Sequence, residues 1–332
     1  MTSKERVKRA IHFQNPDAVP HFLRDGRPDD IVWLWPKSTP IQPWTMVKKD
    51  ADPNLCVWET VNAWGTKSRR FGPDGNGEAV QLPLENIENW STFQAPPLPT
   101  KESYDTEAIR NNPDKYILCV MGSAGSLFEG AHYLRGLADW LTDFYENPEF
   151  VEQVLEMLVE RTIKVIDLCA DLGADGVMGY DDWGIQDRPL MGIELWNEFY
   201  RPRYKKIWDY VHSRGLDVWM HSCGYTLPIL KGWSEIGLNV AQLDQQQNMG
   251  LEVLDRELGG KLAFWCPVDI QNMMIKGTCE DITNYVKQLI FHFGRFGGGL
   301  VSMTYSTPDV IAHDPVKIKA ACDAFRIFGV YS

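Results

Sequence analysis

The sequence predicts an α/β fold, a (β/α)8 TIM-type barrel with N-terminal decorations. In residues 116–328, short apolar runs alternate at least five times with longer runs of helical periodicity, and the connections are short. Right-handed strand–helix crossovers of this kind build a parallel sheet. Strand-like runs continue to the end of the chain and no dinucleotide-binding fingerprint is present, so a closed barrel is favoured over an open sheet.

The first part of the chain is less regular. Thr2 and Glu5 are placed as a capping box, and the helix that they open ends at Asn15-Pro16. Residues 19–24 are expected to form a short strand. Residues 25–115, rich in proline and tryptophan, are expected to form hairpins and short helices that decorate the barrel and shape its pocket.

The regular part of the chain supplies the barrel. Asn147 and Pro148 open a long helix, and Gly173 ends it. The other elements are bounded by glycine, proline or polar residues in a similar way. The expected hairpin is 57–61 with 64–72, the expected strands are 116–121, 175–180, 216–220, 239–243, 262–265 and 299–303, and the further helices are 193–214, 227–236, 251–258, 282–293 and 315–328. No linker demands a second domain, so residues 1–332 are expected to form one domain.

Composition and charge exclude several classes of protein. The 332 residues are 44% hydrophobic, enough for a substantial core, and the net charge of −12 without a basic run argues against a nucleic-acid binder. No apolar run reaches membrane-spanning length, and Met1–Glu5 does not resemble a signal peptide. Seven cysteines, an odd number, fit reduced thiols. We therefore expect a cytoplasmic protein without membrane contact.

Polar or reactive residues follow the strands of the regular part. In a barrel these strand ends converge on one cup, which is where such folds keep their active sites. Each residue alone has a structural alternative, because the aspartates could cap turns and a cysteine could pack as a small hydrophobe. The residues are Asp181 and Asp182, His221 and Cys223, Asp244 and Gln246, Cys266 and Asp269, and Tyr305. The thirteen tryptophans could line the pocket with flat apolar walls.

His221 and Cys223 are the candidate metal ligands. Residues at i and i+2 share one face of a strand, so the imidazole and the thiol point into the same space. Zinc favours both donors and needs a third protein ligand if one position stays open. Cys266 is the candidate for that third ligand, with Asp182 and Glu198 as oxygen alternatives.

Four segments resemble the uroporphyrinogen decarboxylase superfamily. The resemblance covers essentially the whole chain and implies the barrel that the strand–helix pattern predicts. It also implies one of two chemistries, which are decarboxylation of uroporphyrinogen and methyl transfer to or from corrinoids. The segments are Asn15-Pro-Asp-Ala-Val-Pro20, Tyr180-Asp-Asp-Trp-Gly-Ile-Gln186, Trp219-Met-His-Ser-Cys-Gly224 and Trp265-Cys-Pro-Val-Asp-Ile-Gln271.

Departures from the family patterns separate the two chemistries. The decarboxylases carry an Arg-Gln-Ala-Gly-Arg segment that grips the carboxylates of the tetrapyrrole, whereas this chain has Arg24-Asp25-Gly26-Arg27. The shorter segment with an added carboxylate, in a protein of charge −12, disfavours a substrate with eight carboxylates. In the coenzyme M methyltransferases zinc is implied to bind His-x-Cys and a later Cys, and Tyr305 stands where that Cys would fall. The O-demethylase methyltransferases use carboxylate and histidine ligands, and Asp182, Glu198 and His221 occur in a compatible order.

The resemblance thus predicts a corrinoid-dependent methyltransferase that moves a methyl group from a small donor, an aromatic methyl ether, to a cobalamin. The chain lacks the Asp-x-His-x-x-Gly signature of a cobalamin-holding protein, so the corrinoid is expected on a partner protein. A decarboxylase and a non-catalytic ligand-binding barrel are the alternatives. The expected catalytic residues are Asp181, Asp182, Asp244 and Tyr305, the substrate-binding residues are Arg24, Trp183 and Gln246, and the ligands of a possible zinc ion are His221, Cys223 and Cys266.

Overall fold

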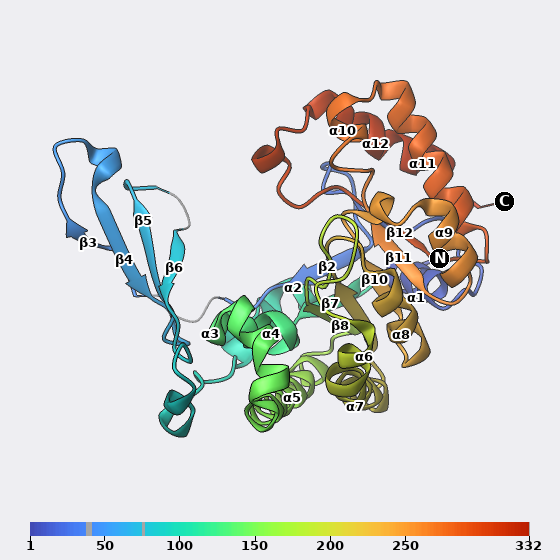
Figure 1. Ribbon diagram of the computed structural model, residues 1–332. Helices are drawn as coiled ribbons and strands as arrows, with labels where there is room; N and C mark the ends of the chain where they lie inside the picture. The colour runs from blue at the N-terminus through green and yellow to red at the C-terminus, as the bar shows by residue number, and fades with distance from the viewer. Residues whose placement is uncertain (38–41, 75–76, 332) are drawn as a thin grey trace.

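Eight parallel strands curl into a nearly closed barrel with helices around it, as the sequence predicts (Figure 1). The structure is a computed structural model and describes residues 1–37, 42–74 and 77–331. The strand order is β1-β12-β11-β10-β9-β8-β7-β2, so the strands follow one another around the barrel in chain order apart from the separate strands β3–β6. The barrel strands are β1 (His21–Phe22), β2 (Ile31–Leu34), β7 (Tyr116–Val120), β8 (Gly176–Tyr180), β9 (Asp217–His221), β10 (Val240–Gln242), β11 (Ala263–Cys266) and β12 (Leu300–Met303).

Helices connect these strands on the outside of the barrel. α1 also contacts β2, β7 and β12, where its Ala10 carbonyl accepts a hydrogen bond from Gly299 N. The α-helices are α1 (Ser3–Ile11), α2 (Thr106–Arg110), α3 (Phe128–Arg135), α4 (Leu137–Glu146), α5 (Pro148–Asp171), α6 (Ile193–Leu195), α7 (Arg201–Ser213), α8 (Leu227–Glu235), α9 (Leu251–Leu258), α10 (Met273–Lys276), α11 (Cys279–Gly294) and α12 (Pro315–Phe328). Of the described residues, none belongs to a helix with both the length and the apolarity needed to span a bilayer.

The helices largely match the sequence prediction. The Thr2 side chain accepts a hydrogen bond from Glu5 N at the start of α1, which is the Thr2 half of the predicted capping box. The predicted helix of residues 193–214 is interrupted by a π-helical turn at Trp196–Tyr200. Pro202 follows directly in the first turn of α7, and it lacks the N–H that an uninterrupted α-helix would use. Nothing was predicted for residues 126–146, where the structure has α3 and α4 on either side of Gly136.

Two buried clusters show how the barrel strands alternate. Trp219 and Trp265 pack edge to face inside the barrel, with ring centroids 5.3 Å apart. Their strand neighbours Val218, Phe264 and Cys266 belong to the other cluster, which lies between the sheet and the helices. Period-two alternation therefore decides which strand residues face the barrel interior.

A second, antiparallel sheet stands out to one side of the barrel (Figure 1). Its strands are β3 (Thr45–Lys48), β4 (Val57–Val61), β5 (Lys67–Phe71) and β6 (Glu78–Gln81), in that order. The pairing of β4 with β5 confirms the predicted hairpin. The sheet belongs to the connection from β2 to β7, which also holds the 3-10 turns Pro53–Leu55, Ile87–Thr92 and Lys101–Ser103; residues 38–41 and 75–76 of this region lie outside the described part of the chain. Further 3-10 turns are Gly122–Gly125, Gln246–Asn248 and Pro308–Ile311.

Candidate functional site

The carboxyl ends of β8 and β9 bring three candidate residues together. Tyr180 and His221 are paired in the parallel register of these strands, and Asp182 follows two residues beyond the end of β8, beside His221. His221 and Cys223 lie two residues apart and share a face, as predicted. His221 Nε2 lies 3.3 Å from an Asp182 carboxylate oxygen and 3.3 Å from Cys223 Sγ.

Asp182, His221 and Cys223 fit a zinc ion. One ligand atom from each residue lies within 4.8 Å of the others, and the three side chains are partly buried. Zinc–ligand bonds of about 2.0–2.3 Å in a tetrahedron place neighbouring ligand atoms roughly 3.5 Å apart, close to the two distances above. Carboxylate, imidazole and thiolate are donors that zinc takes in proteins. Of the three candidates for a third ligand, the geometry favours Asp182.

Backbone contacts hold the two loops that carry this cluster. Gly184 N donates to the Cys223 carbonyl at 3.1 Å, and Tyr225 N donates to the Ile185 carbonyl at 2.7 Å. Cys223 N also donates to Asp182 at 2.8 Å. A Cβ on Gly184 would come within 2.5 Å of Tyr225 N, and Gly224 has a φ of +78° that favours glycine. The spacing of the cluster is therefore set by the backbone.

Gln242 orients the His221 ring, and sequence reasoning missed it. Its amide nitrogen donates to an Asp244 carboxylate oxygen at 2.9 Å, which turns its amide oxygen toward His221 Nδ1. Nδ1 therefore carries the proton, and Nε2 is left free to accept a proton or bind a metal. Asp244, predicted to be catalytic, thus acts on His221 through Gln242. The two-residue period of a strand could have revealed Gln242, because Gln242 and Asp244 lie two residues apart and Gln242 is paired with His221 in the register of β9 and β10.

Burial and neighbouring groups shift the pKa values of all three residues of the cluster. Burial opposes protonation of His221, but Asp182 and Cys223 outweigh burial and raise the pKa of His221 well above its usual value. Burial would raise the pKa of Asp182, but the hydrogen bond and charge of His221 lower it below its usual value. Burial is the main cause of the raised pKa of the Cys223 thiol, against the effect of His221. Without an ion the cluster is thus a partly buried imidazolium–carboxylate pair beside a thiol.

Glu129 on α3 adds a second carboxyl group near the cluster. Burial and the charge of Asp182 raise the pKa of Glu129 to about 7, while Tyr133 and His221 act in the opposite direction. The Tyr133 hydroxyl lies 3.2 Å from Glu129 Oε1. A carboxyl with a pKa near neutrality suits proton transfer. The sequence prediction missed Glu129 because it gave no element for this region.

The sequence treated Asp181 and Asp182 as equivalent, and the structure separates them. The Asp181 side chain is fully buried and accepts hydrogen bonds from Leu127 N and Glu129 N, both at 2.8 Å, and from the Tyr204 hydroxyl at 2.6 Å. Burial raises the pKa of Asp181 to about 8. Asp181 therefore holds the first turn of α3 and does not face the cluster. The sequence predicted that one of the two aspartates caps the turn that follows it. Asp181 instead caps α3, which comes much earlier in the chain.

Cys266 and Glu198 do not join the cluster. Cys266 is fully buried in the layer between sheet and helices, on the opposite strand face from Trp265. Burial raises the pKa of its thiol strongly. Glu198 is exposed on the π-helical turn outside the barrel. Cys266, predicted as a metal ligand, therefore lies apart from Asp182, His221 and Cys223, because strand alternation turns its side chain away from the barrel interior.

Trp183 and Gln246 are buried structural residues in this fold. Trp183 stacks on Phe128 with ring centroids 4.3 Å apart, and its indole N–H lies 3.2 Å from the Tyr204 hydroxyl. The Gln246 amide donates to the Pro267 carbonyl at 2.7 Å. Both side chains have no exposed surface, so neither is placed to touch a substrate directly. Asp269 likewise accepts hydrogen bonds from the backbone of the loop that follows it.

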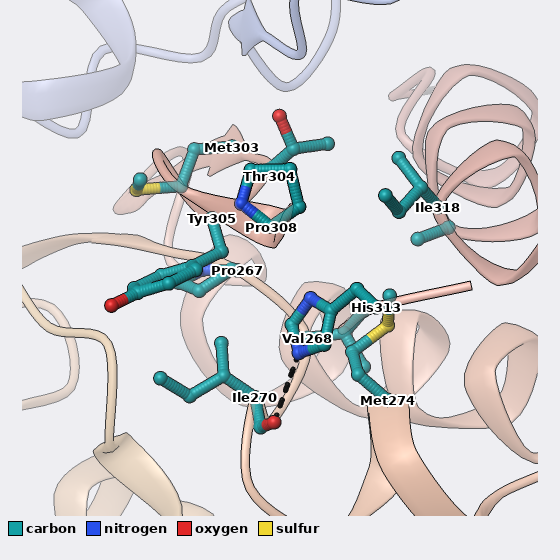
Figure 2. Close-up of a pocket in the computed structure, with 11 residues that line it drawn as sticks. Pro267, Val268, Ile270, Met274, Met303, Thr304, Tyr305, Pro308, His313 and Ile318 are labelled. Atoms are coloured by element: carbon teal, nitrogen blue, oxygen red, sulfur yellow. Dashed lines mark hydrogen bonds between the residues drawn. The ribbon is translucent and has the colours of Figure 1, made fainter. Parts of the chain in front are cut away.

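Tyr305 lines a pocket at the carboxyl ends of β11 and β12 (Figure 2). The pocket is small, with a cavity volume of about 20 Å³, and Met303 on its wall also contacts Gln242, with Sδ 3.3 Å from Nε2. Tyr305 therefore lies in a pocket next to the His221 cluster. Aromatic side chains flank His221 on the other side, where β8 pairs with β9. The Tyr180 ring centroid lies 5.3 Å from that of His221 and 5.3 Å from that of the half-exposed Trp35.

The two arginines that follow β1, Arg24 and Arg27, already make contacts within the protein. Arg24 lies over the Phe22 ring at 5.5 Å and donates to the Ser306 carbonyl at 3.1 Å. Arg27 forms ion pairs with Asp25 and, at 2.8 Å, with Asp323 on α12. Arg24 is exposed and could still meet a substrate, but Arg27 is neutralised by two carboxylates.

Comparisons with known proteins agree with this picture. The family model described as uroporphyrinogen decarboxylase (URO-D) matches residues 69–304. The chain is 25% identical over 326 residues to methylcobamide:CoM methyltransferase MtbA of Methanosarcina mazei, covering 92% of this chain and 94% of that protein. It is 26% identical over 205 residues to the protein of the same name from Methanosarcina acetivorans, but this match spans only 60% of this chain and 59% of that relative.

A solved structure described as a methyltransferase from Methanosarcina mazei superposes with a TM-score of 0.67 and covers 99% of each chain. Its sequence identity to this chain is 16%, so the likeness supports the fold.

Proposed function

The chain belongs to the uroporphyrinogen decarboxylase family, and we propose that it is a corrinoid-dependent methyltransferase of that family. The family membership confirms the resemblance predicted from the sequence motifs. Two relatives that bear the name methylcobamide:CoM methyltransferase support the methyltransferase branch. The observation that carries the proposal is the cluster of Asp182, His221 and Cys223 at the mouth of the barrel.

In this proposal Asp182, His221 Nε2 and Cys223 Sγ hold a zinc ion and leave one position open. When bound, zinc supplies a Lewis acid that polarises an oxygen or sulfur of the small substrate. Two anionic ligands balance the charge of the ion, which suits a buried site. Gln242 and Asp244 keep the His221 ring in the tautomer that such binding needs.

The small substrate in this proposal is an aromatic methyl ether that would give its methyl group to cob(I)alamin carried by a partner protein, where the Co(I) centre would supply the electron pair of the new cobalt–carbon bond. The bond between the methyl carbon and the ether oxygen breaks, and the oxygen leaves as a phenolate. Glu129, with a pKa of about 7, supplies a proton to that oxygen near neutral pH. The aromatic surfaces of Tyr180 and Trp35 beside His221 favour flat apolar reaction partners.

A thiol that receives the methyl group is the second candidate substrate. The relatives named methylcobamide:CoM methyltransferase favour it, because coenzyme M appears in their names. A thiol at the same cluster would use the same three ligand residues. The two substrates differ in what Glu129 does, since a thiol must lose a proton whereas a phenolate must gain one.

Decarboxylation of a polycarboxylate tetrapyrrole is less well supported. The neutralisation of Arg27 by Asp25 and Asp323 leaves few free cations to grip carboxylates. We also propose a cytoplasmic location, and the seven free cysteines of the structure support a reducing compartment.

The decisive test measures zinc content and methyl transfer in the same preparations. Wild-type protein is compared with His221→Ala and Cys223→Ala, and Cys266→Ala is the matched control because that cysteine lies on the other face of its strand. We expect near-stoichiometric zinc and transfer from an aryl methyl ether to free cob(I)alamin, kept reduced in the assay, in wild type and control, and neither in the two ligand variants. Carbon dioxide release from uroporphyrinogen, or full transfer by His221→Ala, would overturn the proposal. Ligand binding without any reaction would favour the non-catalytic barrel.

A further inference from the structure

Three side-chain amides meet at the rim of the barrel mouth and have no role in the mechanism above. Gln186 lies in the loop after β8, Asn248 in the loop after β10 and Gln271 in the loop after β11. The amide nitrogen of Gln186 donates to Asn248 Oδ1 at 3.3 Å and to Gln271 Oε1 at 3.0 Å. One side chain therefore links three loops, and we call these three residues the amide rim.

The amide rim lies beside the loop that carries Cys223. Gln186 directly follows Ile185, whose carbonyl accepts a hydrogen bond from Tyr225 N at 2.7 Å, two residues beyond Cys223. Neighbouring strands of a sheet are about 5 Å apart, so β11 lies two strand spacings, or roughly 10 Å, from the strand of His221. The side chains of a tetrapyrrole-sized ring centred over the metal cluster would therefore reach the rim.

The rim has unused hydrogen-bonding groups of both kinds. A primary amide has two N–H donors and one oxygen that accepts. Gln186 uses both N–H groups within the rim, which leaves its Oε1 as an acceptor, and Gln271 Nε2 remains a donor, because neither atom has a partner among the described residues. Asn248 Nδ2 is buried and likewise has no partner in the described part of the chain. Such a group costs free energy until a ligand or a bridging water meets it.

The rim is electrically neutral. Asp187 and Arg188, which follow Gln186, form an ion pair with each other at 3.1 Å. A ligand with carboxylates at its edge would need cations at this place, and the net charge of −12 disfavours it further. Carboxamides match the rim, because two amides can each donate one hydrogen bond to the other.

We propose that the amide rim binds carboxamide side chains at the edge of the corrin ring and so selects an amidated corrinoid. The inference rests on the proposed function, since it names how the cobalamin is recognised. The corrin ring of cobalamin carries carboxamides at its edge where uroporphyrinogen carries carboxylates, and its acetamides project from the face that receives the methyl group. Trp35, directly after β2, flanks His221 on the other side through Tyr180. A ring above His221 would thus meet an aromatic surface at one edge and the amide rim at the other.

The experiment measures the binding of two corrinoids that differ in their side chains. Cobinamide carries carboxamides, whereas heptamethyl cobyrinate carries methyl esters, which accept hydrogen bonds but cannot donate them. Both are used in the Co(II) form under argon, and quenching of tryptophan fluorescence gives their dissociation constants for the zinc-loaded protein. In Gln186→Leu we expect the dissociation constant of cobinamide to rise about tenfold, the effect of one to two lost hydrogen bonds, with much less change for the ester.

Two further variants accompany this comparison. Gln271→Leu alters the rim from a different loop and should also weaken cobinamide binding. Gln247→Leu is the matched control, because Gln247 is exposed in the same turn as Asn248 but accepts a hydrogen bond from the Tyr285 hydroxyl on α11 at 3.0 Å. It should bind both corrinoids as wild type does. The zinc content of each variant, expected at the wild-type level, shows that the metal cluster is intact.

The outcomes separate this inference from the proposed function. Equal weakening of both corrinoids in Gln186→Leu, or unchanged cobinamide binding in both rim variants, would overturn the role of the rim even if wild type transfers methyl groups to cob(I)alamin. A selective loss of cobinamide binding supports the rim, whichever compound donates the methyl group. Failure of the zinc-loaded wild type to bind either corrinoid would refute the proposed function and this inference with it.

Discussion

The contact between Gln242 and His221 gives the sharpest prediction. Replacing Gln242 with Met keeps the length of the side chain but removes the acceptor for His221 Nδ1 and the donor to Asp244. The imidazole can then turn or change tautomer, and Nε2 is no longer reserved for the metal. Loss of such a supporting partner typically weakens metal binding by about 10–100-fold, or about 1.4–2.7 kcal/mol. Asp244 is almost completely buried, so its unmet carboxylate should also cost about 1–3 kcal/mol of folding stability.

The assay is competition for zinc between the protein and a chromophoric chelator, combined with thermal unfolding of the metal-free protein. Gln246→Met is the matched control, because Gln246 is also a buried glutamine but holds the Pro267 loop. We expect it to leave zinc affinity at the wild-type value. Gln242→Glu keeps an acceptor for His221 and should retain zinc better than Gln242→Met, although it adds charge beside Asp244. Wild-type zinc affinity in a folded Gln242→Met protein would refute the reasoning.

Three further predictions concern single side chains. His221→Ala should abolish zinc binding, whereas Cys266→Ala should keep zinc and lose about 1 kcal/mol of folding stability. Metal analysis and urea unfolding test these two expectations. Loss of zinc in Cys266→Ala would show that Cys266 is a ligand. Asp181→Ala should cost about 3 kcal/mol in urea unfolding, because two buried donors and one partly buried donor lose their acceptor, and an unchanged midpoint would contradict the role given to it. The rate of ether cleavage should fall as the pH rises through about 7, where Glu129 loses the proton that it donates. The pH–rate profile of Glu129→Gln should lack this fall. The same fall in that variant would assign the titration to another group.

The fold could be predicted from the sequence because its signals are local. Alternation of strand and helix periods, with glycine and proline at the boundaries, marks most of the barrel. The four residues of β2 were missed because a short apolar run among prolines has no helix directly after it. α3 and α4 were missed because Gly136 breaks their pattern into two short pieces.

The site could be predicted only in part. His221 and Cys223 follow from the two-residue period of a strand, and the same period would have turned Cys266 away, since Trp265 occupies the inner face. Asp181 and Asp182 lie beyond the end of β8, where no period applies, and only the position of α3 distinguishes them. Glu129 reaches the site from a helix some fifty residues earlier in the chain, which no local pattern reveals.

The glycine contact between the loops after β8 and β9 also affects how this site can change in evolution. Gly184 and Gly224 fix the distance between the loops through the backbone, so the donor positions do not depend on which donor atoms occupy them. A carboxylate in place of Cys223 would leave the frame intact but offer a harder ligand set, which suits other ions. In the proposed metal site the preferred ion can therefore change through single substitutions of the ligand residues, whereas a single methyl group added at either glycine would push the two loops apart.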